Sequence, residues 1–250
     1  MMVGCGVDNT SNTNSNDVNN ENNNTSLQQD NNSNNDVDNN VNNNMNDEEE
    51  EGEEASVLDE ADPSIIKLVN KENELGPDDH PDDLVTIDVP YVLDNPEVNQ
   101  LRKEASDALS EMFAAAKEDN VELLARSGFR SYQTQEALFN SYVEQNGIEE
   151  AKRFSARPGQ SEHQTGLVMD VTSEQVNFDL TEEFGNTSDG IWLKENAHRF
   201  GFIIRYPEDK EHITGYIYEP WHIRYLSVDV ATAVFESGLT YEEFIEEEEG

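Results

Sequence analysis

Basic residues are scarce in this chain. Its 250 residues include 15 Lys and Arg against 55 Asp and Glu, which gives a formal net charge of −40. A protein that binds nucleic acid needs a basic face to neutralise phosphates and release counterions, so this balance argues against nucleic acid as a partner. The same charge disfavours binding to anionic membrane surfaces.

Cysteine and long apolar runs are equally scarce. The single cysteine, Cys5, excludes an internal disulfide and any zinc or iron–sulfur site built from several cysteines. No run approaches the ~20 apolar residues that a membrane-spanning helix needs. What remains is an acidic globular protein of one or two domains.

The first quarter of the chain differs in composition from the rest. Residues 1–62 contain no Lys or Arg, and 19 of the first 46 residues are Asn. Such a stretch cannot bury enough apolar surface to offset its ordering entropy, so we expect a disordered tether over residues 1–62 and one domain over residues 63–250. Cys5 follows small residues and precedes this tether, which resembles the lipidated cysteine of a bacterial lipoprotein without its upstream signal regions.

Apolar alternation and turn residues predict interleaved strands and helices in the second part of the chain. Strands are expected at residues 84–89, 121–125, 167–171, 202–205 and 221–225, and helices at residues 96–120, 134–144, 191–200 and 228–237. Beyond residue 202 most links between strands are too short for a helical crossover. The pattern therefore predicts an α+β domain with a central antiparallel sheet flanked by helices.

Two short segments carry side chains that suit a metal ion. His163 and Asp170 lie on either side of Gly166, and His222 follows Glu219 by three residues. Two imidazoles and one carboxylate bind zinc and leave a fourth tetrahedral position for water, which is the arrangement of a catalytic zinc site. Gly166 permits a tight turn, so that two residues seven positions apart can face one ion.

The second segment also has a feature that bends the chain. Pro220 biases Glu219 toward an extended conformation and interrupts regular alternation, so Glu219 and His222 can converge on one site. We therefore expect His163, Asp170 and His222 to bind a metal. Asp170 could alternatively orient a histidine without touching the ion.

These residues resemble the signature of a known family. Ser161-x-His163-x-x-Gly166-x-x-x-Asp170, together with Glu219-x-Trp221-His222, is similar to the motifs of VanY-type zinc D-alanyl-D-alanine carboxypeptidases, which are related to D-Ala-D-Ala dipeptidases and hedgehog N-terminal domains. The likeness extends over most of residues 64–228. Val168 stands where the family usually has Ala, which concerns the shape of the pocket and not metal ligation.

The resemblance implies a role for each candidate residue. Glu219 would be the general base that takes a proton from water and passes it to the leaving amine. Arg130 has a planar fork of donors that suits the terminal carboxylate of a peptide, and Gln135 and Ser161 would support substrate binding. One Zn²⁺ ion would be held by His163, Asp170 and His222.

The expected activity is removal of the C-terminal D-Ala from peptidoglycan stem peptides or precursors. The expected setting is outside the cytoplasm of a bacterium, as a monomer that is secreted or anchored by a lipid on Cys5. Cleavage by an L,D-carboxypeptidase or an endopeptidase of the same polymer stays open, because residue spacing does not reveal the shape of the pocket.

Two other classes of protein share part of the pattern. Two histidines and a carboxylate also bind iron in non-haem oxygenases. Those enzymes commonly leave one residue between the first two ligands, whereas six separate His163 from Asp170, and they have no use for Glu219. A zinc-bearing interaction domain is the other alternative, and the presence of both Glu219 and Arg130 argues against it.

Overall fold

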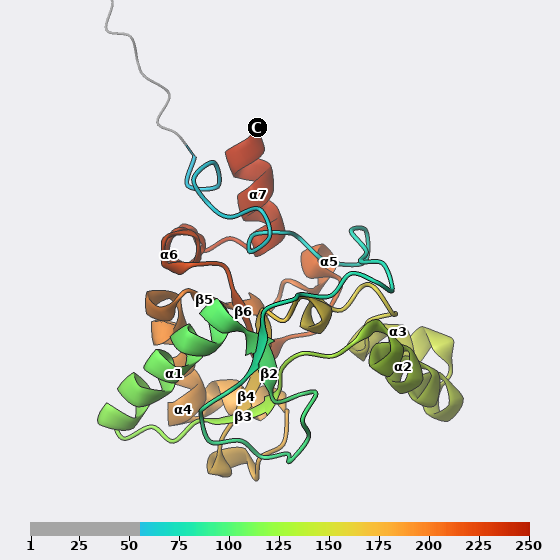
Figure 1. The fold of residues 1–250 in the computed structure, drawn as a ribbon, viewed down its shortest axis with the longest axis horizontal. Helices are drawn as coiled ribbons and strands as arrows, with labels where there is room; N and C mark the ends of the chain where they lie inside the picture. Colours follow the sequence, from blue (N-terminus) through green and yellow to red (C-terminus); the bar gives the residue numbers. More distant parts are fainter. Residues whose placement is uncertain (1–55) are drawn as a thin grey trace, which may run out of the picture. The chain divides into compact units, whose positions relative to one another are not determined.

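A four-stranded antiparallel sheet lies at the centre of residues 56–250, which are the residues that the computed structural model describes (Figure 1). Its strands run in the order β3 (Leu124–Ser127), β4 (Val168–Thr172), β6 (Glu219–Tyr225) and β5 (Phe202–Tyr206). A separate antiparallel pair joins β1 (Leu84–Thr86) to β2 (Gln100–Arg102). The predicted α+β fold with an antiparallel sheet is confirmed.

Helices of very different length surround the central sheet. The α-helices are α1 (Lys103–Glu118), α2 (Tyr132–Asn146), α3 (Ile148–Phe154), α4 (Ser188–Asn196), α5 (Glu211–Thr214), α6 (Val228–Ser237) and α7 (Tyr241–Glu249). Short 3₁₀ segments are η1 (Glu162–Thr165), η2 (Glu174–Val176), η3 (Glu182–Asn186) and η4 (Ala197–Phe200). Within residues 56–250, no helix combines the length and apolar character needed to cross a membrane.

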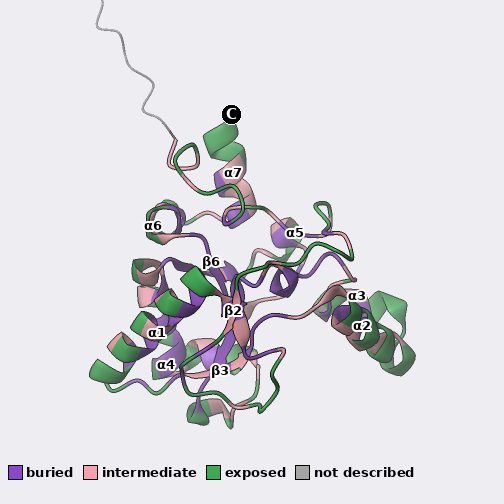
Figure 2. Ribbon diagram, in the orientation of Figure 1, coloured by how far each residue is buried: buried purple, intermediate pink, exposed green. Residues whose placement is uncertain are grey.

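The central sheet has one apolar face and one polar face. Met169 and Ile223 are directly opposite each other on β4 and β6, and both are fully buried in the main apolar cluster, which also includes Leu109 of α1. Each fully buried aliphatic side chain of this kind contributes about 1.5–3 kcal/mol to folding. Because side chains alternate along a strand, the neighbouring residues Asp170 and His222 share the opposite face. Figure 2 shows the central strands as buried, whereas α2 and α3 carry mainly exposed residues.

The predicted helix over residues 96–120 begins later than the sequence pattern indicates. Residues 100–102 form β2, in which Leu101 pairs with Val85 of β1 and is fully buried. The helix α1 then starts at Lys103. The hydrogen bonds and burial that β1 offers outweigh the helical periodicity of these three residues.

The packed part of the chain begins before the predicted boundary at residue 63. Residues 1–55, which include Cys5 and most of the predicted tether, lie outside the described residues. Val57, Leu58 and Ala61 pack against a second apolar cluster, which is formed mainly by α6 and α7. Residues 57–61 therefore contribute to the core of the domain.

Candidate metal centre and active site

Three of the predicted site residues meet on the polar face of the sheet. Each of His163, Asp170 and His222 offers one ligand atom, and these atoms all lie within 4.8 Å of one another. All three residues are buried, and no other group of this kind occurs in the described part of the chain. The structure thus brings together the whole predicted ligand set.

Register and a glycine turn position these three residues. Asp170 on β4 lies directly opposite His222 on β6, and Asp170 Oδ1 is 3.2 Å from His222 Nδ1. His163 lies in η1, with its Nε2 atom 3.5 Å from Asp170 Oδ2. Gly166 ends η1 in the left-handed conformation at φ +69°, and a Cβ atom there would lie 2.8 Å from Leu84 Cδ2. The left-handed conformation and the close approach of Leu84 both favour glycine at this turn.

Each imidazole turns one nitrogen toward the shared space and the other toward the protein. His163 Nδ1 donates a hydrogen bond to the carbonyl oxygen of Gly128 at 2.7 Å, which leaves Nε2 directed at Asp170. His222 directs Nδ1 at Asp170, and its Nε2 atom lies 3.5 Å from Glu162 Oε2. The two rings pack edge to face with centroids 5.0 Å apart. Contacts such as those with the Gly128 carbonyl and with Glu162 fix the orientation of metal-binding histidines.

The charges around the three residues favour a cation. Burial and the nearby Arg130 guanidinium lower the pKa of His163 to about 3, so this imidazole is neutral, as a metal ligand must be. Burial alone would lower the pKa of His222, but the carboxylates of Asp170 and Glu162 raise it to about 9. Asp170 Oδ1 is buried and has no hydrogen-bond partner of acceptable geometry. A metal ion would satisfy that oxygen.

Glu219 lies beside this group at the start of β6. Its Oε2 atom is 3.4 Å from His222 Nδ1, and it pairs with Tyr206 across a register shift between β5 and β6. This irregularity puts Glu219 and His222 on the same side, as the presence of Pro220 led us to expect. Burial, together with the Asp170 carboxylate, raises the pKa of Glu219 to about 7, whereas His222 opposes this rise. Glu219 can therefore exchange a proton near neutral pH.

A cavity of about 340 Å³ opens over these side chains. Arg130 and Ser161 line it, together with Tyr206, Tyr216 and Trp221. Aromatic and polar side chains therefore line the cavity together.

Gln135 lies behind Arg130. The Arg130 guanidinium donates from Nη1 to Gln135 Oε1 at 2.7 Å and from Nη2 to Ser127 Oγ at 3.2 Å. Gln135 in turn donates to the carbonyl oxygen of Ala156 at 2.6 Å and is almost fully buried. The structure therefore places Gln135 where it holds Arg130 in position.

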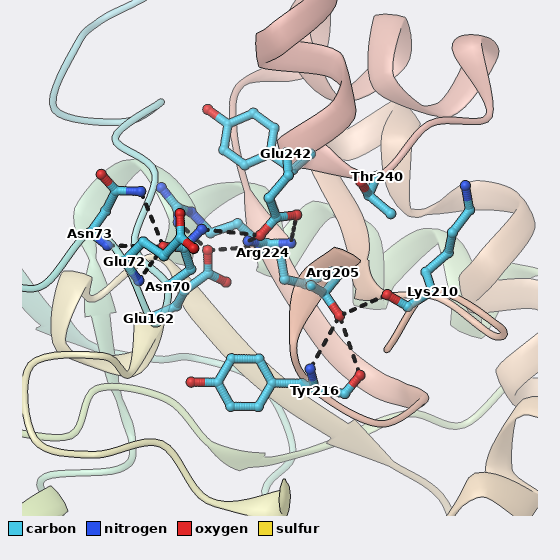
Figure 3. A network of polar contacts seen from close by, with 12 residues as sticks. Asn70, Glu72, Asn73, Glu162, Arg205, Lys210, Tyr216, Arg224, Thr240 and Glu242 are labelled. Atoms are coloured by element: carbon cyan, nitrogen blue, oxygen red, sulfur yellow. Dashed lines mark hydrogen bonds and ion pairs between the residues drawn. The ribbon is translucent and has the colours of Figure 1, made fainter. Parts of the chain in front are cut away.

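Glu162 is a site residue that sequence reasoning missed. It is fully buried, and its Oε1 atom accepts hydrogen bonds from Arg205 Nε at 2.9 Å and from Arg224 Nη1 at 2.8 Å (Figure 3). Burial would raise the pKa of Glu162, but the two guanidinium groups hold it well below its usual range. The sequence did contain a signal for it. Arg205 and Arg224 each lie within a largely apolar strand, and a buried arginine needs a buried carboxylate as its partner.

Known proteins resemble this chain in sequence and in fold. A family model described as VanY, D-alanyl-D-alanine carboxypeptidase, matches residues 98–228, which contain all seven predicted site residues. The putative carboxypeptidase YodJ of Bacillus subtilis is 47% identical over 184 residues, which are 73% of this chain and 67% of YodJ.

Two solved structures agree with this match. The LdcB LD-carboxypeptidase is 47% identical with a TM-score of 0.71, over 74% of this chain and 87% of LdcB. A vancomycin resistance D,D-pentapeptidase VanY, solved in complex with Zn(II), is 33% identical with a TM-score of 0.61, over 73% of this chain and 99% of that one. Fold and site together define a carboxypeptidase. Within that class, the chain belongs to the VanY family.

Proposed function

We propose that this protein is a zinc-dependent carboxypeptidase that removes the C-terminal D-Ala from peptidoglycan stem peptides ending in D-Ala-D-Ala. The observation that carries the proposal is the convergence of His163, Asp170 and His222 beside Glu219 and Arg130. A VanY relative solved with Zn(II) supports the choice of metal. We place the protein outside the cytoplasm, where its proposed substrate lies.

The residues present fit one zinc ion. Two imidazoles and a carboxylate are a common ligand set of catalytic zinc, and Asp170 Oδ1 is a buried oxygen without a donor. His163, Asp170 and His222 would hold the ion. When bound, zinc supplies a Lewis acid and lowers the pKa of a water toward ~7.

The chain's own side chains supply the remaining chemistry. Glu219 takes a proton from the attacking water and delivers it to the amine that leaves when the peptide bond breaks. Arg130 binds the terminal carboxylate of the substrate with its planar fork of donors. Gln135 and Ser127 hold the guanidinium so that fewer rotamers are lost on binding. Ser161 contacts the substrate from the cavity wall.

L,D-cleavage is a second candidate function, favoured by a specific observation. The LdcB LD-carboxypeptidase has a higher identity and TM-score than the D,D-pentapeptidase VanY. In both reactions a terminal D-amino acid leaves, so the roles proposed for Glu219 and Arg130 are the same. The two candidates differ in the configuration of the residue before the scissile bond.

Mass spectrometry of defined stem peptides tests the proposal. The protein is incubated with a pentapeptide that ends in D-Ala-D-Ala and, separately, with a tetrapeptide that ends in a single D-Ala. We expect the pentapeptide to lose one residue, a chelator to abolish the loss and added Zn²⁺ to restore it. Cleavage of the tetrapeptide alone would select the L,D reaction. An internal cut, or no cut by the zinc-loaded protein, would overturn the proposal.

A further inference from the structure

Four charged side chains form a buried group that links Glu242 of the C-terminal helix α7 to Glu162, which precedes His163 in the sequence (Figure 3). Arg205 binds Glu162 through Nε, and it binds Glu242 of α7 through Nη1 at 2.8 Å and Nη2 at 2.5 Å. Arg224 completes the group by its bond to Glu162. The side chains of Glu162, Arg205 and Arg224 are 0% exposed, and that of Glu242 is 11% exposed. Two cations therefore balance two anions away from water.

This group reaches the metal site through one atom. Glu162 uses Oε1 for both arginines, and its Oε2 atom lies 3.5 Å from His222 Nε2. Glu162 Oε2 and His222 Nε2 are both buried, neither accepts or donates a hydrogen bond of acceptable geometry, and their 3.5 Å approach is a charge contact. A proton on Nε2 that points at Glu162 leaves Nδ1, which faces Asp170, with a free lone pair for a metal.

The helix α7 lies outside the part of the chain that the family model matches. That match ends at residue 228, whereas α7 begins at Tyr241. Thr240 and Glu243 cap the helix with a reciprocal pair of hydrogen bonds, which fixes where Glu242 enters the domain. Asn70 of the N-terminal segment adds a contact to Glu242 at 3.4 Å.

We propose that α7 is a positioning element of the metal centre. Glu242 holds Arg205, Arg205 and Arg224 hold Glu162, and Glu162 orients and polarises His222. The inference rests on the proposed zinc site. It adds Glu242, a residue that the family motifs do not include.

Loss of the Glu242 charge would act on His222 in two ways. The buried group would carry an excess positive charge, which repels a metal cation nearby. Arg205 would also lose the partner of its two terminal nitrogens and would draw more strongly on Glu162. Removal of a group that supports a metal ligand typically lowers metal affinity by about 10–100-fold. We expect such a loss for Glu162→Gln, and a smaller loss in the same direction for Glu242→Gln.

Competition with a chromophoric chelator measures zinc affinity without reference to catalysis. Wild-type protein is compared with Glu162→Gln and Glu242→Gln, well below the unfolding temperature of each. Glu247→Gln removes an exposed carboxylate from the same helix and should leave zinc affinity unchanged. Glu243→Gln removes the charge that pairs with Lys210, and because a glutamine at this position can still complete the helix cap, it should leave zinc affinity unchanged.

A conservative variant strengthens the test. Glu242→Asp keeps the charge and should recover most of the zinc affinity that Glu242→Gln loses. It also serves if Glu242→Gln does not fold, because its affinity should then lie below that of wild type and above that of Glu162→Gln. Wild-type affinity in Glu242→Gln, or an equal loss in Glu243→Gln, would overturn the role of α7. A wild-type protein that binds no zinc would instead overturn the proposed function.

Discussion

At the scale of single residues, substitution of Glu219 should separate metal binding from hydrolysis. Its carboxylate lies 3.4 Å from His222 Nδ1 but is not needed to complete the group of three ligand atoms. Because a carboxamide cannot accept the proton of the attacking water, we expect Glu219→Gln to lower kcat by about 10²–10⁴-fold. The same variant should still bind one equivalent of zinc. Release of D-Ala measures the first effect, and metal analysis of the dialysed protein measures the second.

The matched control for this variant is Glu208→Gln. Glu208 is exposed in the loop after β5, so its loss should change neither kcat nor zinc content. Hydrolysis at the wild-type rate by zinc-loaded Glu219→Gln would assign the base to another group. Loss of zinc from Glu219→Gln would show that this carboxylate is itself a ligand.

At the scale of elements, the turn between η1 and β4 constrains the site through Gly166. Gly166 and Gly238 both have φ +69°, but a Cβ atom would meet Leu84 Cδ2 at 2.8 Å in the first case and nothing within 4 Å in the second. Both alanine variants should lose roughly 1–2 kcal/mol for the left-handed conformation. Gly166→Ala should lose a further ~1–3 kcal/mol for the clash, as measured by urea unfolding. Equal losses would show that the neighbouring side chains simply move aside.

The elements also show what sequence patterns can predict. The strands at 202–205 and 221–225 and the helix at 228–237 were predicted within two residues, because turn residues bound clear apolar patterns. The strand β2 was missed because its conformation depends on pairing with β1. Helix α7 was missed because the acidic run that ends it carries no apolar period.

At the scale of the whole molecule, contacts between residues that lie far apart in the sequence also limit what can be predicted. His163, Asp170 and His222 could be foreseen because they lie within two short motifs. The ion pairs behind them join residues 43, 62 and 37 positions apart, as Glu162 meets Arg205 and Arg224 and as Arg205 meets Glu242. No local pattern states which buried arginine meets which carboxylate, so these contacts required the structure.

Two buried carboxylates, those of Glu162 and Asp170, and the half-buried carboxylate of Glu97 should make the whole fold sensitive to acid. The pKa values of Glu162, Glu97 and Asp170 are all lowered: burial alone would raise each of them, and nearby cations or hydrogen-bond donors outweigh it. The unfolded chain therefore binds protons at a higher pH than the folded domain does. Their contribution is fully present above the ordinary carboxyl pKa of about 4 and is lost as the pH falls through the lower folded values.

Urea unfolding of the metal-free protein between pH 7 and pH 3 measures this effect, because no metal then competes with protons. The free energy of unfolding should fall below about pH 4. Glu97→Gln should reduce the steepness of this fall, because Glu97 accepts hydrogen bonds from the Ser131 amide and the Thr134 hydroxyl.

High salt should preserve the fall, since buried pairs are screened much less than surface charges. The formal charge of −40 has the opposite effect on the free energy of unfolding. As the pH falls, protonation relieves repulsion between carboxylates and so stabilises the folded domain. A free energy of unfolding that rises steadily down to pH 3 would mean that this repulsion, and not the buried pairs, controls stability.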